Sequence, residues 1–177
     1  MLDSAGPWFT EIAKRGYAVL PGVFAACEVD SLAADLNAAL TGVGEHAASL
    51  RSRQGKVYAA RNLLDLFPPA KSLWKRPPLA ELLRRVLGEE CGLVRGLYFD
   101  KPPERSWSLP WHRDLTIAVR DNRLPTARFR NPTTKAGSAC VEAPREMLER
   151  ILALRIHLDA VDAENGPLLV IPGSHLD

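Results

Sequence analysis

The 177-residue sequence has few cysteines, little net charge and no long hydrophobic run, and each shortage excludes a class of protein. Three cysteines, far apart and without a C-x-x-C pair, do not make a disulfide framework and indicate a reducing compartment. A net charge of +2 creates no strong attraction to nucleic acid or membranes. No apolar run approaches the roughly 20 residues that span a bilayer, and the N-terminus lacks a signal peptide. We therefore expect a soluble, cytoplasmic protein without nucleic-acid or membrane partners.

The composition is that of a globular domain with many chain breaks. Hydrophobic residues make up 46% and charged residues 25%, which predicts a packed core rather than disorder. Fourteen prolines and 12 glycines argue against a plain helix bundle. The length suits one domain, residues 1–177, with a helical part at 1–92 and a β-rich part at 93–177. Helices followed by strands indicate an α+β or mainly β fold.

Apolar spacing predicts most of the elements. Residues recurring at three and four predict helices at 7–15, 25–41 and 77–87, each followed by a glycine. Short apolar runs between turn signals predict strands at 17–20, 93–99, 115–119, 154–158 and 168–171. Residues 42–55 and 120–137 are expected to form loops, and residues 142–150 one or two helical turns. The arginines of the second loop either face an anionic ligand or lie in solvent.

A candidate metal site lies at residues 110–115, which read PWHRDL directly before a predicted strand. In an extended chain, His112 and Asp114 point to one face and Arg113 to the other. An imidazole and a carboxylate so placed can bind one metal ion. A second histidine would complete the two-His, one-carboxylate triad of non-haem Fe(II) oxygenases. From spacing alone, either His157 or His175 could supply it. A surface His–Asp pair near a turn is the structural alternative.

Other chemistries have less support. The sequence holds no G-x-S-x-G, no G-x-G-x-x-G and no P-loop. Cys140 lies near Glu142 but has no histidine nearby in sequence. A buried structural thiol is therefore favoured over a cysteine nucleophile.

Four stretches resemble the phytanoyl-CoA dioxygenase (PhyH) family, which belongs to the Fe(II)/2-oxoglutarate oxygenases. They read GYAVLPGV at 16–23, LYFDKPP at 97–103 leading into PWHRDL, IHLD at 156–159, and NGPLLVIPGSH at 165–175. The last stretch is the most specific. Arg113 replaces the family's usual glutamine, at the position between the two ligands. The resemblance implies a double-stranded β-helix, a cupin-like jelly roll, with the N-terminal helices packed outside.

The resemblance also implies a site and a reaction. It assigns His112 and Asp114 as ligands of Fe(II), with 2-oxoglutarate as co-substrate, O2 as oxidant and a small molecule whose C–H bond is hydroxylated. It makes Lys101 and Arg155 candidate contacts of the co-substrate, although a strand-end lysine reaching into solvent is the alternative for Lys101. The family's third ligand and its 2-oxoglutarate-binding arginine come tens of residues after the PGSH turn. The resemblance therefore implies a C-terminally truncated chain, in which His157 is not a ligand.

Two other functions stay open. The chain could be a non-catalytic PhyH-like β-domain that binds a ligand or partner. It could also be a cupin-type metal protein that uses His175 as the third ligand. A jelly roll without its last strands would expose sheet edges and core-facing apolar side chains. We therefore expect the isolated chain to be poorly soluble or oligomeric, and no residue selects a particular substrate.

Overall fold

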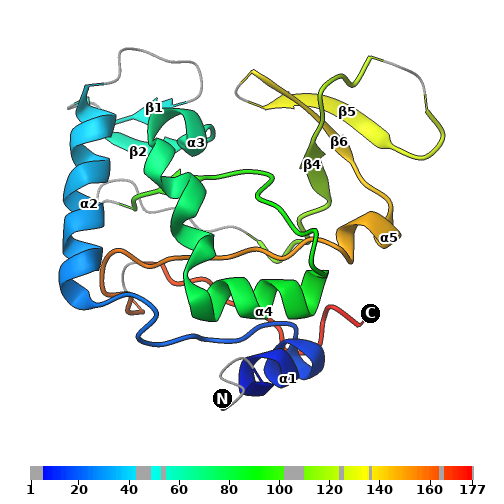
Figure 1. Ribbon diagram of the computed structural model, residues 1–177. Coiled ribbons are helices and arrows are strands. Elements are labelled where there is room, and N and C mark those ends of the chain that lie inside the picture. Colours follow the sequence, from blue (N-terminus) through cyan, green and yellow to red (C-terminus); the bar gives the residue numbers. More distant parts are fainter. Residues whose placement is uncertain are drawn as a thin grey trace.

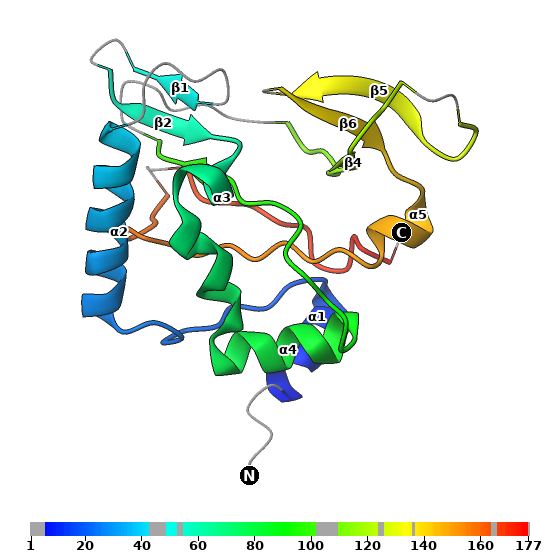
Figure 2. The same cartoon turned by 45° about the horizontal axis from the view of Figure 1, so that its top comes forward.

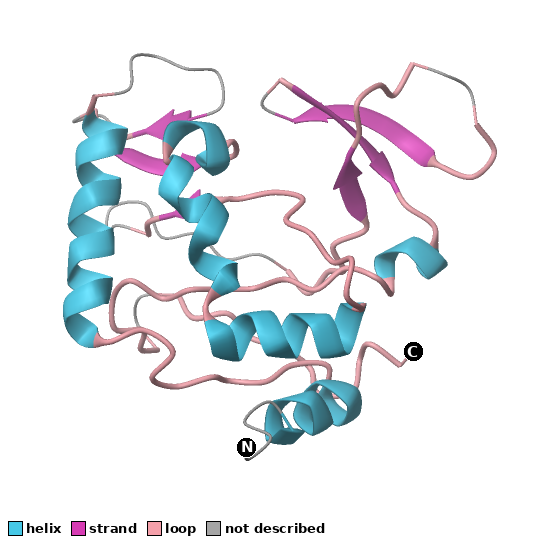
Figure 3. Ribbon diagram, viewed as in Figure 1, coloured by secondary structure: helices cyan, strands magenta, loops and turns pink. Residues whose placement is uncertain are grey.

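A computed structural model describes residues 6–42, 49–52, 55–101, 110–123, 126–135, 137–163 and 166–176. This part of the chain combines helices with two small antiparallel sheets (Figures 1 and 3). It confirms the predicted mixture of helix and sheet. Within the described ranges the strands do not close into a barrel. None of the described helices is long and apolar enough to cross a membrane.

The three predicted helices are confirmed. They are α1 (Gly6–Arg15), α2 (Ala26–Thr41) and α4 (Pro77–Leu87). Helix α4 has proline at its first turn and is followed by Gly88, whose φ of 96° suits glycine. Its buried face consists of leucines. Helix α1 packs against α4, where the guanidinium carbon of Arg85 lies 4.7 Å from the centre of the Phe9 ring.

Two of the three strands of the first sheet lie within residues 1–92, the part of the sequence predicted to be helical. Its strand order is β1 (Ser49–Arg51), β2 (Val57–Ala60) and β3 (Tyr98–Phe99), all antiparallel. Helix α3 (Leu63–Leu66) and the 3-10 helix η1 (Pro68–Lys75) follow β2. The sheet and α2 share the main core, which comprises Leu36, Leu40, Val57, Ala60 and Phe67. Tyr98 and Leu158 pack against this core, so the C-terminal half contributes to it.

The second sheet is formed by β4 (Thr116–Ala118), β6 (Ser138–Glu142) and β5 (Arg130–Lys135), in that order. Strand β4 confirms the strand predicted at 115–119. The prediction of a loop at 120–137 is wrong for residues 130–135, which form β5. There Asn131, with a φ of 47°, and Pro132 interrupt the register between Arg130 and Thr133. An edge strand tolerates such a bulge and a proline, so the proline-rich composition did not exclude a strand.

Several predicted strands do not form. Residues 17–20, 154–158 and 168–171 are not strands, and the strand predicted at 93–99 is reduced to β3. No backbone hydrogen bond joins residues 152–159 or 166–170 to the described part of the chain. The apolar pattern predicts where the backbone can extend, whereas a strand also needs a neighbour. The predicted helical turns after Pro144 are confirmed as α5 (Arg145–Leu148). Strand β1 falls in the predicted loop 42–55, of which 43–48 and 53–54 lie outside the described residues.

Candidate metal centre

His112 and Asp114 lie together just before β4. The Nδ1 atom of His112 is 2.8 Å from the carbonyl oxygen of Pro110, a separation at which Nδ1–H donates a hydrogen bond. Holding the proton on Nδ1 leaves the lone pair of Nε2 available to a metal ion. That Nε2 atom lies 3.9 Å from Oδ1 of Asp114. The local chain therefore places one imidazole nitrogen and one carboxylate, both candidate metal ligands, close to each other.

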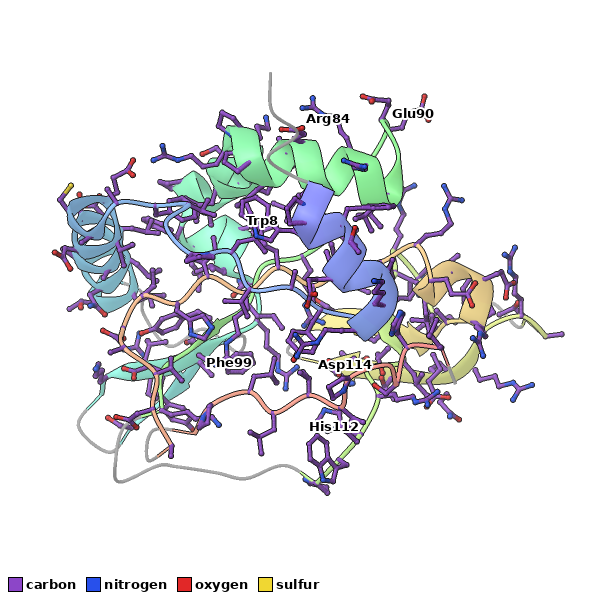
Figure 4. All side chains as sticks on the ribbon, turned by 90° about the horizontal axis from the view of Figure 1, so that it is seen from below. Trp8, Arg84, Glu90, Phe99, His112 and Asp114 are labelled. Atoms are coloured by element: carbon purple, nitrogen blue, oxygen red, sulfur yellow. The ribbon has the colours of Figure 1, made fainter. Side chains whose placement is uncertain are left out.

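Both side chains are open to solvent. The His112 side chain is 50% exposed and the Asp114 side chain 100% exposed. Figure 4 shows the pair on the side of the molecule opposite to α4, where Arg84 is labelled. Phe99 lies on this same side and is also exposed. A metal ion can therefore reach the pair without any rearrangement of the helices.

The described residues bring two candidate ligands together and no third. Within them, no group of three histidine, cysteine, aspartate or glutamate side chains is close enough to hold a metal ion. His157 is exposed on the extended segment that follows α5. His112 and Asp114 are thus one imidazole and one carboxylate, two of the three ligand types that a facial triad uses.

His175 lies at the C-terminal end of α1. Its Nε2 atom is 3.2 Å from the carbonyl oxygen of Ala13, and the N–H of Gly173 donates a hydrogen bond to the carbonyl oxygen of Arg15 at 2.9 Å. A Cβ atom on Gly16 would lie 2.5 Å from Nδ1 of His175. The PGSH turn thus binds the last carbonyl groups of α1, which a helix leaves without partners inside itself.

Lys101 and Arg155 were the candidate contacts of the co-substrate. The Nζ atom of Lys101 donates a hydrogen bond to the carbonyl oxygen of Gly166 at 3.2 Å. This contact joins two stretches that are 65 residues apart and that both carry the family resemblance. Arg155 is exposed and makes no ion pair with the described part of the chain. Within the described residues, Lys101 and Arg155 share no hydrogen-bond or ion-pair partner.

Tyr98 is a residue that the sequence did not single out. It is half-buried beside the main core. Burial is the main cause that raises its pKa to about 12, and the carboxylates of Asp100 and Asp159 add to the shift. Asp100 itself pairs with Lys56 at 2.7 Å. The phenol therefore keeps its proton to a higher pH than an ordinary tyrosine does, at the place where Tyr98 and Leu158 both pack against the main core. The feature of the sequence that could have drawn attention to Tyr98 is its position in the LYFDKPP stretch.

Two arginines of residues 120–137 form ion pairs with carboxylates at the protein surface. Arg123 pairs with Asp121 at 2.8 Å, and Arg128 pairs with Glu146 at 3.2 Å. The Arg123 guanidinium lowers the pKa of Asp121 through hydrogen bonds. This favours the solvated interpretation of the basic segment over an anion site. Cys140 is fully buried, with Sγ 3.5 Å from the carbonyl oxygen of Ser138, as expected for a structural thiol.

Comparison with known proteins agrees with the resemblance seen in the sequence. Residues 12–177 match the protein family described as phytanoyl-CoA dioxygenase (PhyH). The match covers nearly the whole chain and includes both His112 and Asp114. Comparisons with curated proteins and with solved structures gave no match. On the family match, this chain belongs to the phytanoyl-CoA dioxygenase (PhyH) family.

Proposed function

We propose that this chain carries the metal-binding motif of an Fe(II)- and 2-oxoglutarate-dependent dioxygenase that hydroxylates a C–H bond of a small molecule. Membership of the PhyH family supports the reaction class. The observation that carries the proposal is the orientation of His112, whose Nδ1 faces the Pro110 carbonyl while Nε2 faces Asp114. A cytoplasmic location is part of the proposal and is supported by three free cysteines.

The donor set fits two positions of an iron site. Nε2 of His112 is 3.9 Å from Oδ1 of Asp114, close enough for a small rotation of the exposed carboxylate to bring both atoms to the bonding distance of about 2 Å from one metal ion. One imidazole and one carboxylate are the ligand types of the facial triad. Iron bound there would supply the activation of O2 and 2-oxoglutarate. The chain's own residues position the ion: Pro110 fixes the tautomer of His112, and the exposed Asp114 carboxylate rotates to meet the metal.

A jelly-roll architecture is also part of the proposal. Three features support it. The extended residues after α5 run across the molecule toward α2, with α3 above and α4 below them (Figures 1 and 2), both sheets are antiparallel, and the metal motif directly precedes β4. In this proposal Lys101 orients the turn at Gly166 through its hydrogen bond to the Gly166 carbonyl oxygen rather than binding the co-substrate.

Anaerobic calorimetry with Mn(II) as a redox-inert probe tests the metal site. We expect Mn(II) to bind, and 2-oxoglutarate to bind only when Mn(II) is present. His112→Ala and Asp114→Asn should each abolish Mn(II) binding, because each removes one of two ligands. His157→Ala is the matched control, since His157 is an exposed histidine outside the pair. Equal Mn(II) affinity in all four proteins would contradict the assignment.

The second candidate function is a non-catalytic PhyH-like ligand-binding domain. The observation that favours it is that the described residues contain no three-ligand group. The same titration separates the two functions. Mn(II) binding with no 2-oxoglutarate binding, together with no succinate formed from 2-oxoglutarate in the presence of Fe(II) and O2, would favour the non-catalytic domain.

A further inference from the structure

Lys135 places a positive charge beside the start of β4. Its Nζ atom donates a hydrogen bond to Oγ1 of Thr116 at 3.3 Å, in a partly buried position. Thr116 is the first residue of β4 and comes two residues after Asp114. The contact therefore joins the last residue of β5 to the strand that directly follows the metal motif.

Strand pairing puts Lys135 and Thr116 on one face of the second sheet, which Figure 1 shows as β4, β6 and β5. Thr116 is opposite Glu142, and Lys135 is opposite Ser138. Residues directly opposite each other in an antiparallel pair share a face. Ser138 and Glu142 are four residues apart on β6, so their side chains also point to the same face.

The same alternation extends to the candidate metal ligands. The N–H of Ala143 donates a hydrogen bond to the carbonyl oxygen of Leu115 at 3.0 Å, so the pairing with β6 continues one residue beyond β4. Asp114 then has the same side as Thr116, and His112 joins them because its Nε2 is 3.9 Å from Oδ1 of Asp114. Two residues of extended chain span about 7 Å. A small molecule bound at the pair is therefore within reach of the Lys135 ammonium group.

The charge of Lys135 has no counterion among the described residues. Its recorded hydrogen bond goes to a neutral hydroxyl group, and it makes no ion pair with Glu142 on the same face. It differs in this from Arg123 and Arg128, which pair with carboxylates of this chain. A partly buried cation gains stability when an anion pairs with it. The position therefore suits an anionic group of a ligand.

We propose that Lys135 binds the carboxylate of a small molecule held at His112 and Asp114. This inference rests on the proposed metal site and adds the charge of the ligand to it. The Nζ atom donates to the carboxylate, and the Thr116 hydroxyl, which already accepts from Nζ, has its own proton left to donate. The carboxylate belongs either to 2-oxoglutarate or to the molecule that is hydroxylated, and the two sources require different probes.

Calorimetry on the Mn(II)-loaded protein tests the co-substrate as the source. 2-Oxoglutarate and 2-oxopentanoate share one carbon chain, and only 2-oxoglutarate carries a second carboxylate. If Lys135 holds that carboxylate, Lys135→Met should weaken 2-oxoglutarate binding roughly 10- to 100-fold, the effect of one hydrogen bond to a charged group. Binding of 2-oxopentanoate should not change. Lys135→Arg keeps the charge and should retain the preference for 2-oxoglutarate.

A second pair of probes tests the hydroxylated molecule as the source. Hexanoate and hexanamide are titrated into protein that already holds Mn(II) and 2-oxoglutarate. If Lys135 faces the hydroxylated molecule, hexanoate should bind more tightly than hexanamide, and Lys135→Met should remove this difference. Affinity for 2-oxoglutarate should then be the same in the wild-type protein and in Lys135→Met.

Lys71→Met is the matched control, because Lys71 is an exposed lysine on η1, outside the second sheet. Loss of either preference in Lys135→Met but not in Lys71→Met supports the proposal, with circular dichroism showing that both variants are folded. A Mn(II)-loaded protein that shows neither preference, or that keeps both in Lys135→Met, overturns the proposal and leaves the metal site intact. A wild-type chain that binds no Mn(II) overturns the metal site and this inference together.

Discussion

Gly16 and His175, 159 positions apart in sequence, are in direct contact. A Cβ atom on residue 16 would lie 2.5 Å from Nδ1 of His175, and Gly16 has a φ of 82°. Glycine is therefore required at residue 16 for two reasons: the backbone is left-handed, and the imidazole occupies the space that a side chain would fill. This contact joins the first helix to the last turn of the chain.

Gly16→Ala should destabilise the protein more than Gly22→Ala. Both glycines have positive φ, but only Gly16 has a neighbour within 4 Å of the added methyl group. The left-handed backbone costs alanine about 1–2 kcal/mol at either position, and overpacking adds about 1–3 kcal/mol at Gly16. Urea unfolding measures both. In a His175→Ala background the difference between the two glycine variants should shrink, and an unchanged difference would show that the imidazole is not its cause.

His175→Ala should leave Mn(II) affinity unchanged and lower stability by about 1 kcal/mol, the typical value of one hydrogen bond. The reason is that His175 is held at the Ala13 carbonyl by its Nε2 atom. Calorimetry and urea unfolding on the same sample give both quantities. Loss of Mn(II) binding with intact stability would instead support a cupin-type site with His175 as a ligand.

Stability should fall with rising pH above pH 10 because of Tyr98. Burial and two nearby carboxylates raise its pKa in the folded state from 10.0 to about 12. The unfolded chain therefore loses the phenolic proton first, so the contribution is complete below pH 10 and disappears as pH approaches 12. Urea unfolding at several pH values measures the slope. Tyr98→Phe should reduce this slope, whereas Tyr58→Phe, which leaves the Tyr98 phenol in place, should retain it.

Leu36→Ala should cost about 2–5 kcal/mol, because a buried leucine leaves a cavity when truncated. Leu36 is 4% exposed within the main core, between α2 and the first sheet. Leu93→Ala is the matched control, since Leu93 is 41% exposed and should lose no more than about 0.5 kcal/mol. Similar losses of unfolding free energy for both variants would place the core elsewhere.

The sequence by itself determined the local features of this protein. Apolar spacing and a following glycine were enough for α1, α2 and α4, because helical hydrogen bonds form within one segment. The H-x-D spacing was likewise enough to bring His112 and Asp114 together, since the two residues are neighbours on one short stretch.

Only the tertiary structure decided which segments pair as strands and which residues far apart in sequence come into contact. Residues 154–158 and 168–171 have the pattern of strands, yet no strand in the described part of the chain pairs with them, while the proline-containing β5 is a strand because β6 pairs with it. The same applies to histidines: His175 contacts α1 because the chain returns to its first helix, and no spacing rule indicates this. Hydrogen-bond pairing and burial are relations between segments, so a sequence pattern can permit them but cannot choose the partner.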